Sequence, residues 1–94
     1  MSEVTIYGTV WCVTSWDVRR LLDSIGVAYR FVDLDESQDA RAWAMGLGDG
    51  RWLPPLPIVR LPDGSIIVGA TRRDMAAHYH VRLDTGVLRP MIPR

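Results

Sequence analysis

The sequence contains a single cysteine, Cys12, between a short run of strand-forming residues and an amphipathic helical pattern. Its surroundings read Thr9-Val10-Trp11-Cys12-Val13-Thr14-Ser15-Trp16. A thiol at the start of a helix lies beside unpaired backbone N–H groups and the positive end of the helix dipole, which favour the nucleophilic thiolate. We therefore predict thiol chemistry at Cys12. The alternative is an inert buried cysteine that packs like a small hydrophobic residue.

Composition and charge narrow the remaining classes of function. Lys+Arg and Asp+Glu both total 11, so the formal net charge is +0, which does not favour partners such as nucleic acid or a membrane surface. No apolar stretch approaches the roughly 20 residues that span a bilayer, and one cysteine cannot form an internal disulfide. The amino terminus shows no secretory leader pattern, so we expect a cytoplasmic protein. His78 and His80, two residues apart on a predicted helix, point in different directions, and we expect no metal site.

The elements that position Cys12 alternate between strand and helix along the 94 residues. Strands are predicted at residues 4–10, 28–35, 58–61 and 65–68. Helices are predicted from Ser15 to Gly26, from a cap at Asp35 or Ser37 to about Leu47, and from Thr71 to about Tyr79 or beyond. Asp35 or Ser37 caps the second helix, Asp63-Gly64 predicts a hairpin turn, and Thr71 with Asp74 forms a capping box on the last helix. The first two strands flank a crossover helix and should be parallel. We expect one domain at residues 1–82 and a C-terminal tail at 83–94.

Three landmarks in this order resemble the glutaredoxin form of the thioredoxin fold. They are Trp11-Cys12-Val13-Thr14-Ser15, Leu56-Pro57-Ile58-Val59, and Val68-Gly69-Ala70-Thr71 followed by Asp74. The resemblance covers roughly residues 4–80 and implies an α/β fold of order β-α-β-α-β-β-α with a four-stranded mixed sheet. Among subfamilies, the Thr-x-Trp-Cys spacing looks closest to mycoredoxins and other actinobacterial glutaredoxin-like proteins.

The resemblance places Cys12 and Ser15 at the two catalytic positions of the family, with Ser15 replacing the second cysteine. This replacement implies a monothiol route, because Ser15 cannot resolve a mixed disulfide. The Ser15 hydroxyl can donate a hydrogen bond to the thiolate. Alternatively, Ser15 is a helix-start residue that fills the former cysteine position.

The resemblance also implies a binding surface for the thiol substrate. Its expected members are Trp11, Thr14, Leu56, Pro57, Thr71 and Asp74. Pro57 is the expected cis-proline, and Leu56 would offer its backbone N–H and C=O groups to an extended substrate. Thr71 and Asp74 can equally serve as helix caps alone. Thr14 departs from the family, which usually has an aromatic residue at this position.

The implied function is reduction of S-thiolated proteins with a low-molecular-weight thiol, mycothiol or glutathione, as co-substrate and with no permanently bound cofactor. Thr9 replaces a Lys that many glutathione-using relatives carry, which favours mycothiol, although Arg51 or Arg72 can supply a charge from elsewhere. An iron–sulfur carrier is a second hypothesis, but the Cys-Gly-Phe-Ser motif of that class is absent. The third is a binding module that keeps the fold without turnover.

Overall fold

The chain follows the predicted order of strands and helices. The computed structural model describes residues 3–82, and the predicted tail at 83–94 lies outside the described residues. The elements are β1 (Val4–Gly8), α1 (Val13–Ser24), β2 (Tyr29–Asp33), α2 (Gln38–Gly46), β3 (Ile58–Arg60), β4 (Ile66–Val68) and α3 (Arg72–His78).

The four strands form one mixed sheet of order β2-β1-β3-β4. β1 and β2 are parallel, as predicted for two strands joined by a crossover helix, whereas β3 is antiparallel to both β1 and β4. β3 and β4 form the predicted hairpin. The α/β thioredoxin fold is thus confirmed.

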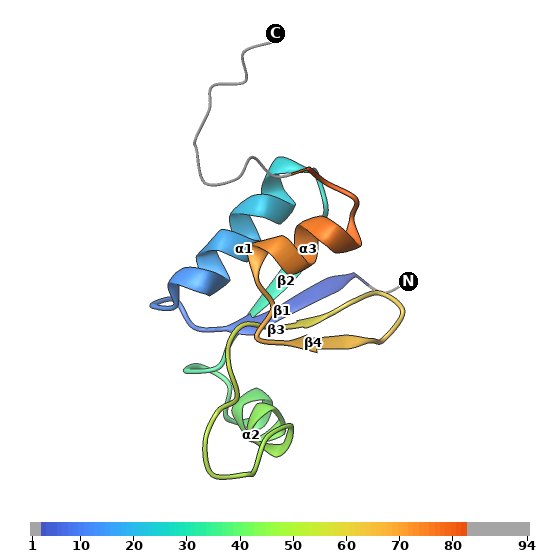
Figure 1. Cartoon of the computed structure of the whole chain (residues 1–94). Coiled ribbons are helices and arrows are strands. Elements are labelled where there is room, and N and C mark those ends of the chain that lie inside the picture. The colour runs from blue at the N-terminus through green and yellow to red at the C-terminus, as the bar shows by residue number, and fades with distance from the viewer. Residues whose placement is uncertain (1–2, 83–94) are drawn as a thin grey trace, which may run out of the picture.

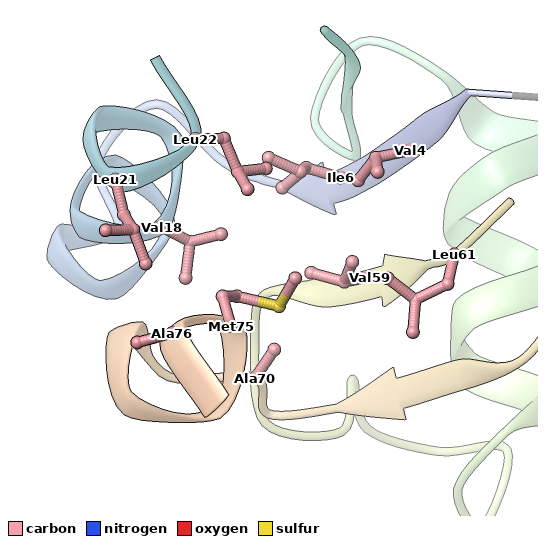
Figure 2. Close-up of a cluster of buried hydrophobic side chains, with 10 residues drawn as sticks. All are labelled: Val4, Ile6, Val18, Leu21, Leu22, Val59, Leu61, Ala70, Met75 and Ala76. Atoms are coloured by element: carbon pink, nitrogen blue, oxygen red, sulfur yellow. The ribbon is translucent and has the colours of Figure 1, made fainter. Parts of the chain in front are cut away.

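The helices lie on opposite faces of this sheet (Figure 1). α1 and α3 lie together on one face and α2 lies on the other. The main core fills the space between the sheet and the α1–α3 pair, where Met75 of α3 is directed toward Val59 of β3 (Figure 2). A smaller buried cluster of Leu34, Ala44 and Ile58 joins α2 to the other face. The thicker apolar layer therefore supports the helix that begins next to Cys12.

Strand alternation and helical periodicity account for this arrangement. Val4 and Ile6 point into the main core, while Thr5 and Tyr7, which alternate with them along β1, point to the α2 face. Val18, Leu21 and Leu22 form the buried stripe of α1. The chain leaves this helix through Gly26, whose φ of +76° is the left-handed conformation that glycine adopts readily.

Three of the element boundaries that differ from the prediction lie at turns. β1 ends at Gly8, and the next four residues turn so that the Cys12 N–H donates to the Thr9 carbonyl (3.3 Å). Val10 is consequently exposed, and α1 begins at Val13 instead of Ser15. α3 ends at His78, so the interpretation of His80 as helical is wrong: it has a φ of +57°. Apolar periodicity does not register these turns, because each depends on backbone hydrogen bonds.

Candidate active site around Cys12

Strand register brings the three predicted landmarks to one end of the sheet. Tyr7 pairs with Ile58, and Ile58 pairs with Val68, so Pro57 lies beside Gly8 on one side and Gly69 on the other. The Ala70 N–H donates to the Pro57 carbonyl (2.9 Å), which ties the third landmark to the second. This end of the sheet is also where β1 leads into the Cys12 turn.

Cys12 occupies the N-cap position of α1. Its backbone is extended (φ −89°, ψ 116°), its side chain is half-buried, and no side chain caps the helix. Its carbonyl accepts the Trp16 N–H (3.3 Å), and no acidic residue is present in the first turn. The first N–H groups of α1 are therefore available to stabilise negative charge on sulfur.

A hydrogen-bonded chain holds Trp11 beside the cysteine. The Trp11 indole N–H donates to Oδ2 of Asp35 (2.9 Å), and Oδ1 of the same carboxylate accepts from Arg41 (3.3 Å). The Trp11 side chain is nevertheless 68% exposed. Its ring is thus oriented by Asp35 while most of its surface remains free to contact a substrate.

Trp16 fixes the same turn from the helix side. Its indole N–H donates to the Val10 carbonyl (2.6 Å). The Arg19 guanidinium lies 4.1 Å from the centroid of the Trp16 ring and 4.2 Å from that of Phe31, so the tryptophan is held against the body of the domain. Trp11 and Trp16 therefore anchor the residues that precede Cys12 to two different elements.

Ser15 does not make the expected hydrogen bond to Cys12. Its side chain is 0% exposed, and its Oγ has no hydrogen-bond partner. It packs tightly against Gly8, where an added Cβ would overlap the Ser15 Oγ. Ser15 lies one helical turn after Cys12 and is buried against β1. This geometry favours the alternative interpretation, in which Ser15 fills the position of a second cysteine.

The loop before β3 has the expected conformation. The Leu56–Pro57 peptide bond is cis, which confirms Pro57 among the three nearby prolines. Pro57 is buried, and Leu56 is half-buried in the cluster beneath α2. Gly69 lies against Pro55 with a φ of +66°, and an added Cβ would lie 2.9 Å from the Pro55 Cβ. The close approach of these two segments depends on this glycine.

The predicted capping box is present at the start of α3. The Thr71 hydroxyl accepts the Asp74 N–H (3.1 Å), and the Asp74 carboxylate accepts the Thr71 N–H (2.9 Å). The prediction that these residues act as caps is confirmed. Both side chains are also exposed, so their contact with a thiol substrate stays a prediction, as does that of the half-buried Thr14.

Asp35, which accepts the Trp11 indole N–H, is the residue near Cys12 that the sequence interpretation missed, because it was considered only as a cap for α2. The actual cap is Ser37, whose hydroxyl accepts the Ala40 N–H (3.1 Å). A signal was available, since Asp35 follows β2 closely and the carboxyl ends of parallel strands meet at one edge of a sheet. That rule places Asp35 near the turn that follows β1.

Within residues 3–82, no cluster of three or more His, Cys, Asp or Glu side chains is arranged to hold a metal ion. None of the helices in the same range combines the length and apolar character needed to cross a membrane.

Comparison with known proteins identifies relatives with the glutaredoxin form of the thioredoxin fold. The glutaredoxin family model matches residues 4–58. Mycoredoxin 1 of Corynebacterium glutamicum is 37% identical over 65 residues, which represent 69% of this chain and 77% of that protein. Among solved structures, the Escherichia coli NrdH-redoxin has a TM-score of 0.66 at 22% identity, covering 87% of this chain and 100% of the other. An Archaeoglobus fulgidus glutaredoxin has a TM-score of 0.60 at 17% identity, covering 82% and 85%.

The glutaredoxin family match and the identity to mycoredoxin 1, with a half-buried thiol at the start of α1, show a thiol–disulfide oxidoreductase. Within that class, the extent of the family match and the identity to mycoredoxin place the sequence more narrowly. The chain belongs to the glutaredoxin family.

Proposed function

We propose that this protein is a monothiol oxidoreductase that removes low-molecular-weight thiols from S-thiolated proteins. The observation that carries the proposal is the position of Cys12, the only cysteine, at an N-cap with no competing side-chain cap. At this position the free N–H groups and the positive end of the helix dipole can stabilise a thiolate, because no capping oxygen uses them.

The reaction then has two exchange steps. The Cys12 thiolate attacks the low-molecular-weight half of a protein mixed disulfide, and the protein sulfur leaves as a thiolate that takes up a proton. Cys12 is now disulfide-linked to the small thiol. A second small thiol, as its thiolate, attacks that small-molecule sulfur, which releases the symmetrical small-molecule disulfide and regenerates the Cys12 thiolate. Ser15 supplies no sulfur for an internal disulfide, so each turnover consumes one free small thiol, which leaves in a disulfide with the small thiol removed from the protein.

The surface around Cys12 suits an extended, partly apolar substrate. Val10, Trp11 and Val13 are 54%, 68% and 73% exposed, which is unusual for three apolar side chains next to one another. Leu56 would add backbone hydrogen bonds to such a substrate. Trp11 and Thr14 would contact it near the sulfur, while Thr71 and Asp74 would hold its other end through groups that the capping box leaves free.

Mycothiol is the co-substrate that we favour over glutathione. The residue that replaces the lysine of glutathione-using relatives, Thr9, is buried and offers no charge at the surface. Arg51 is 81% exposed beside Asp49, and Arg72 lines a hollow between α1 and α3. The identity to a mycoredoxin points the same way. Because such thiols are kept reduced in the cytoplasm, we propose that compartment for the reaction.

The test compares two substrates that differ only in the small thiol. A peptide carrying one cysteine is blocked with mycothiol or with glutathione, and release of the free peptide thiol is followed with the matching reductant. We expect faster release from the mycothiol adduct, and mass spectrometry should detect mycothiol on Cys12 when the second thiol is withheld. Cys12→Ala is the control. Equal release of the peptide thiol by wild type and Cys12→Ala would contradict the proposed function. Faster release from the glutathione adduct than from the mycothiol adduct would contradict only the choice of thiol.

A further inference from the structure

A shallow groove with both polar and apolar walls lies on the α2 face of the sheet, where β1, β2 and β3 meet α2. It encloses about 410 Å³, and its walls include Thr5, Tyr7, Arg30, Trp43 and Arg60. Cys12 is not part of it, and Thr5 lies three residues before the end of β1 that leads to the cysteine. The proposed redox reaction gives this groove no role.

The sheet register sets two arginines side by side in the groove. Thr5 pairs with Arg30 on β2 and with Arg60 on β3, so the two arginines share a row and a face with Thr5 between them. Strands in a sheet are about 4.8 Å apart, which separates the two Cα atoms by roughly 10 Å. Arginine side chains of this spacing can direct both guanidinium groups at one anion.

Arg60 is held in place by aromatic rings. Its guanidinium carbon lies 5.4 Å from the centroid of the Trp43 ring and 5.8 Å from that of Tyr7, and these two rings are 4.5 Å apart. Stacking uses the flat face of a guanidinium and leaves the N–H groups at its edge free to bind an anion. The arginine is therefore oriented before any ligand arrives.

Neither groove arginine has a carboxylate partner among the residues that the structure describes. Within the same residues, ion pairs form between Arg41 and Asp35 and between Arg51 and Asp49. Asp39 also lines the groove, so two positive charges face one negative charge. An incoming anion would thus meet a net positive wall that contains unoccupied donors.

We propose that this groove binds a small-molecule phosphate monoester. Two guanidinium groups and the hydroxyls of Thr5 and Tyr7 provide donors for the three terminal oxygens of such a dianion, more than a carboxylate can use. The volume falls in the range of small-molecule sites, about 300–1,000 Å³, so it accommodates an organic group in addition to the phosphate. The exposed parts of Tyr7 and Trp43 provide the apolar surface for that group.

The test uses adenosine 5′-monophosphate, with adenosine and inorganic phosphate as the two matched half-ligands at constant ionic strength. The indole N–H signals of the full chain are assigned by single Trp→Phe substitutions and followed by NMR. We expect the Trp43 signal to shift saturably with adenosine monophosphate and only weakly with either half-ligand. Adenosine monophosphate that moves no Trp43 signal would overturn the proposal, and so would equal binding of inorganic phosphate.

Charge variants locate the site. Arg30→Gln and Arg60→Gln should each weaken binding about tenfold, the loss of one charge-assisted contact. Asp39→Asn should strengthen it about twofold, because it removes the opposing charge. Arg73, an exposed residue of α3, provides the control. Arg73→Gln makes the same change in net charge and should bind adenosine monophosphate as the wild type does. Equal weakening by Arg73→Gln would show general charge screening and overturn the site. Circular dichroism checks that each variant is folded.

Discussion

The three helices of this domain begin in two different ways. α2 begins with Ser37, whose hydroxyl accepts a backbone N–H, and α3 begins with a complete capping box of Thr71 and Asp74. α1 is longer than either, yet it begins with Cys12 and has neither a side-chain cap nor an acidic residue in its first turn. The uncapped helix is the one that carries the thiol.

This difference separates stability from function. A capping side chain contributes about 1 kcal/mol to the free energy of unfolding because it satisfies N–H groups that water would otherwise solvate. At α1 the same groups are left for a sulfur whose charge changes during the reaction. The chain thus accepts a less stable helix start at the position where an unsatisfied donor is useful.

Cys12→Ser should have the largest effect and should move activity and stability in opposite directions. Serine is a preferred N-cap, so its hydroxyl can accept the N–H groups of the first turn and raise the free energy of unfolding by up to about 1 kcal/mol. The nucleophile is lost, so thiol exchange should fall to the background rate. Denaturant unfolding and the mixed-disulfide assay measure the two effects.

Cys12→Ala is the matched control, because it removes the thiol without adding a cap. It should be equally inactive, and it should lack the gain in stability. If Cys12→Ser proved no more stable than Cys12→Ala, the N–H groups of α1 would not be available to a capping atom, and the contrast with α3 would be lost.

Val13→Glu should weaken the same site by adding an acidic residue to the first turn. Val13 is 73% exposed, so the change disturbs little packing. A carboxylate there stabilises the helix through its dipole but repels the thiolate. A repulsion of about 0.3–1 kcal/mol corresponds to a rate of thiol exchange roughly twofold to fivefold lower at neutral pH. Val13→Gln, of the same shape without charge, should retain the wild-type rate. A pH profile that is identical for both variants would contradict the electrostatic explanation.

Thr71→Ala tests whether a capped helix start also binds substrate. Loss of the hydroxyl should lower the free energy of unfolding by about 1 kcal/mol, as should Ser37→Ala at α2. If Thr71 contacts the thiol substrate as proposed, only Thr71→Ala should also raise KM, with kcat nearly unchanged. Thr71→Ser should restore both properties. Equal KM values for Thr71→Ala and Ser37→Ala would leave Thr71 with a capping role alone.

Much of this contrast follows from the sequence because capping and periodicity are local. The capping box at Thr71 and the hairpin at Asp63-Gly64 follow from short patterns, whereas the cis peptide bond before Pro57 is expected from the family resemblance, and the structure has each of them. The orientation of Ser15 and the role of Asp35 depend on contacts between segments far apart in sequence. No pattern of spacing reports how tightly Gly8 packs on Ser15.

The smallest expected effect concerns Asp63, which caps the β3–β4 turn as Asp74 caps α3. Hydrogen bonds from the Ser65 hydroxyl (2.6 Å) and the Ser65 N–H (2.9 Å) lower the pKa of the Asp63 carboxyl below its usual value. A carboxyl with a lowered folded-state pKa adds stability above its unfolded-state pKa, and this contribution is lost as the pH falls through the folded-state value. Asp63→Asn should therefore lower Tm slightly at neutral pH and leave it unchanged at about pH 2. Thermal unfolding at the two pH values measures this. A Tm difference that persists at acid pH would assign the effect to turn geometry and not to the charge of the Asp63 carboxylate.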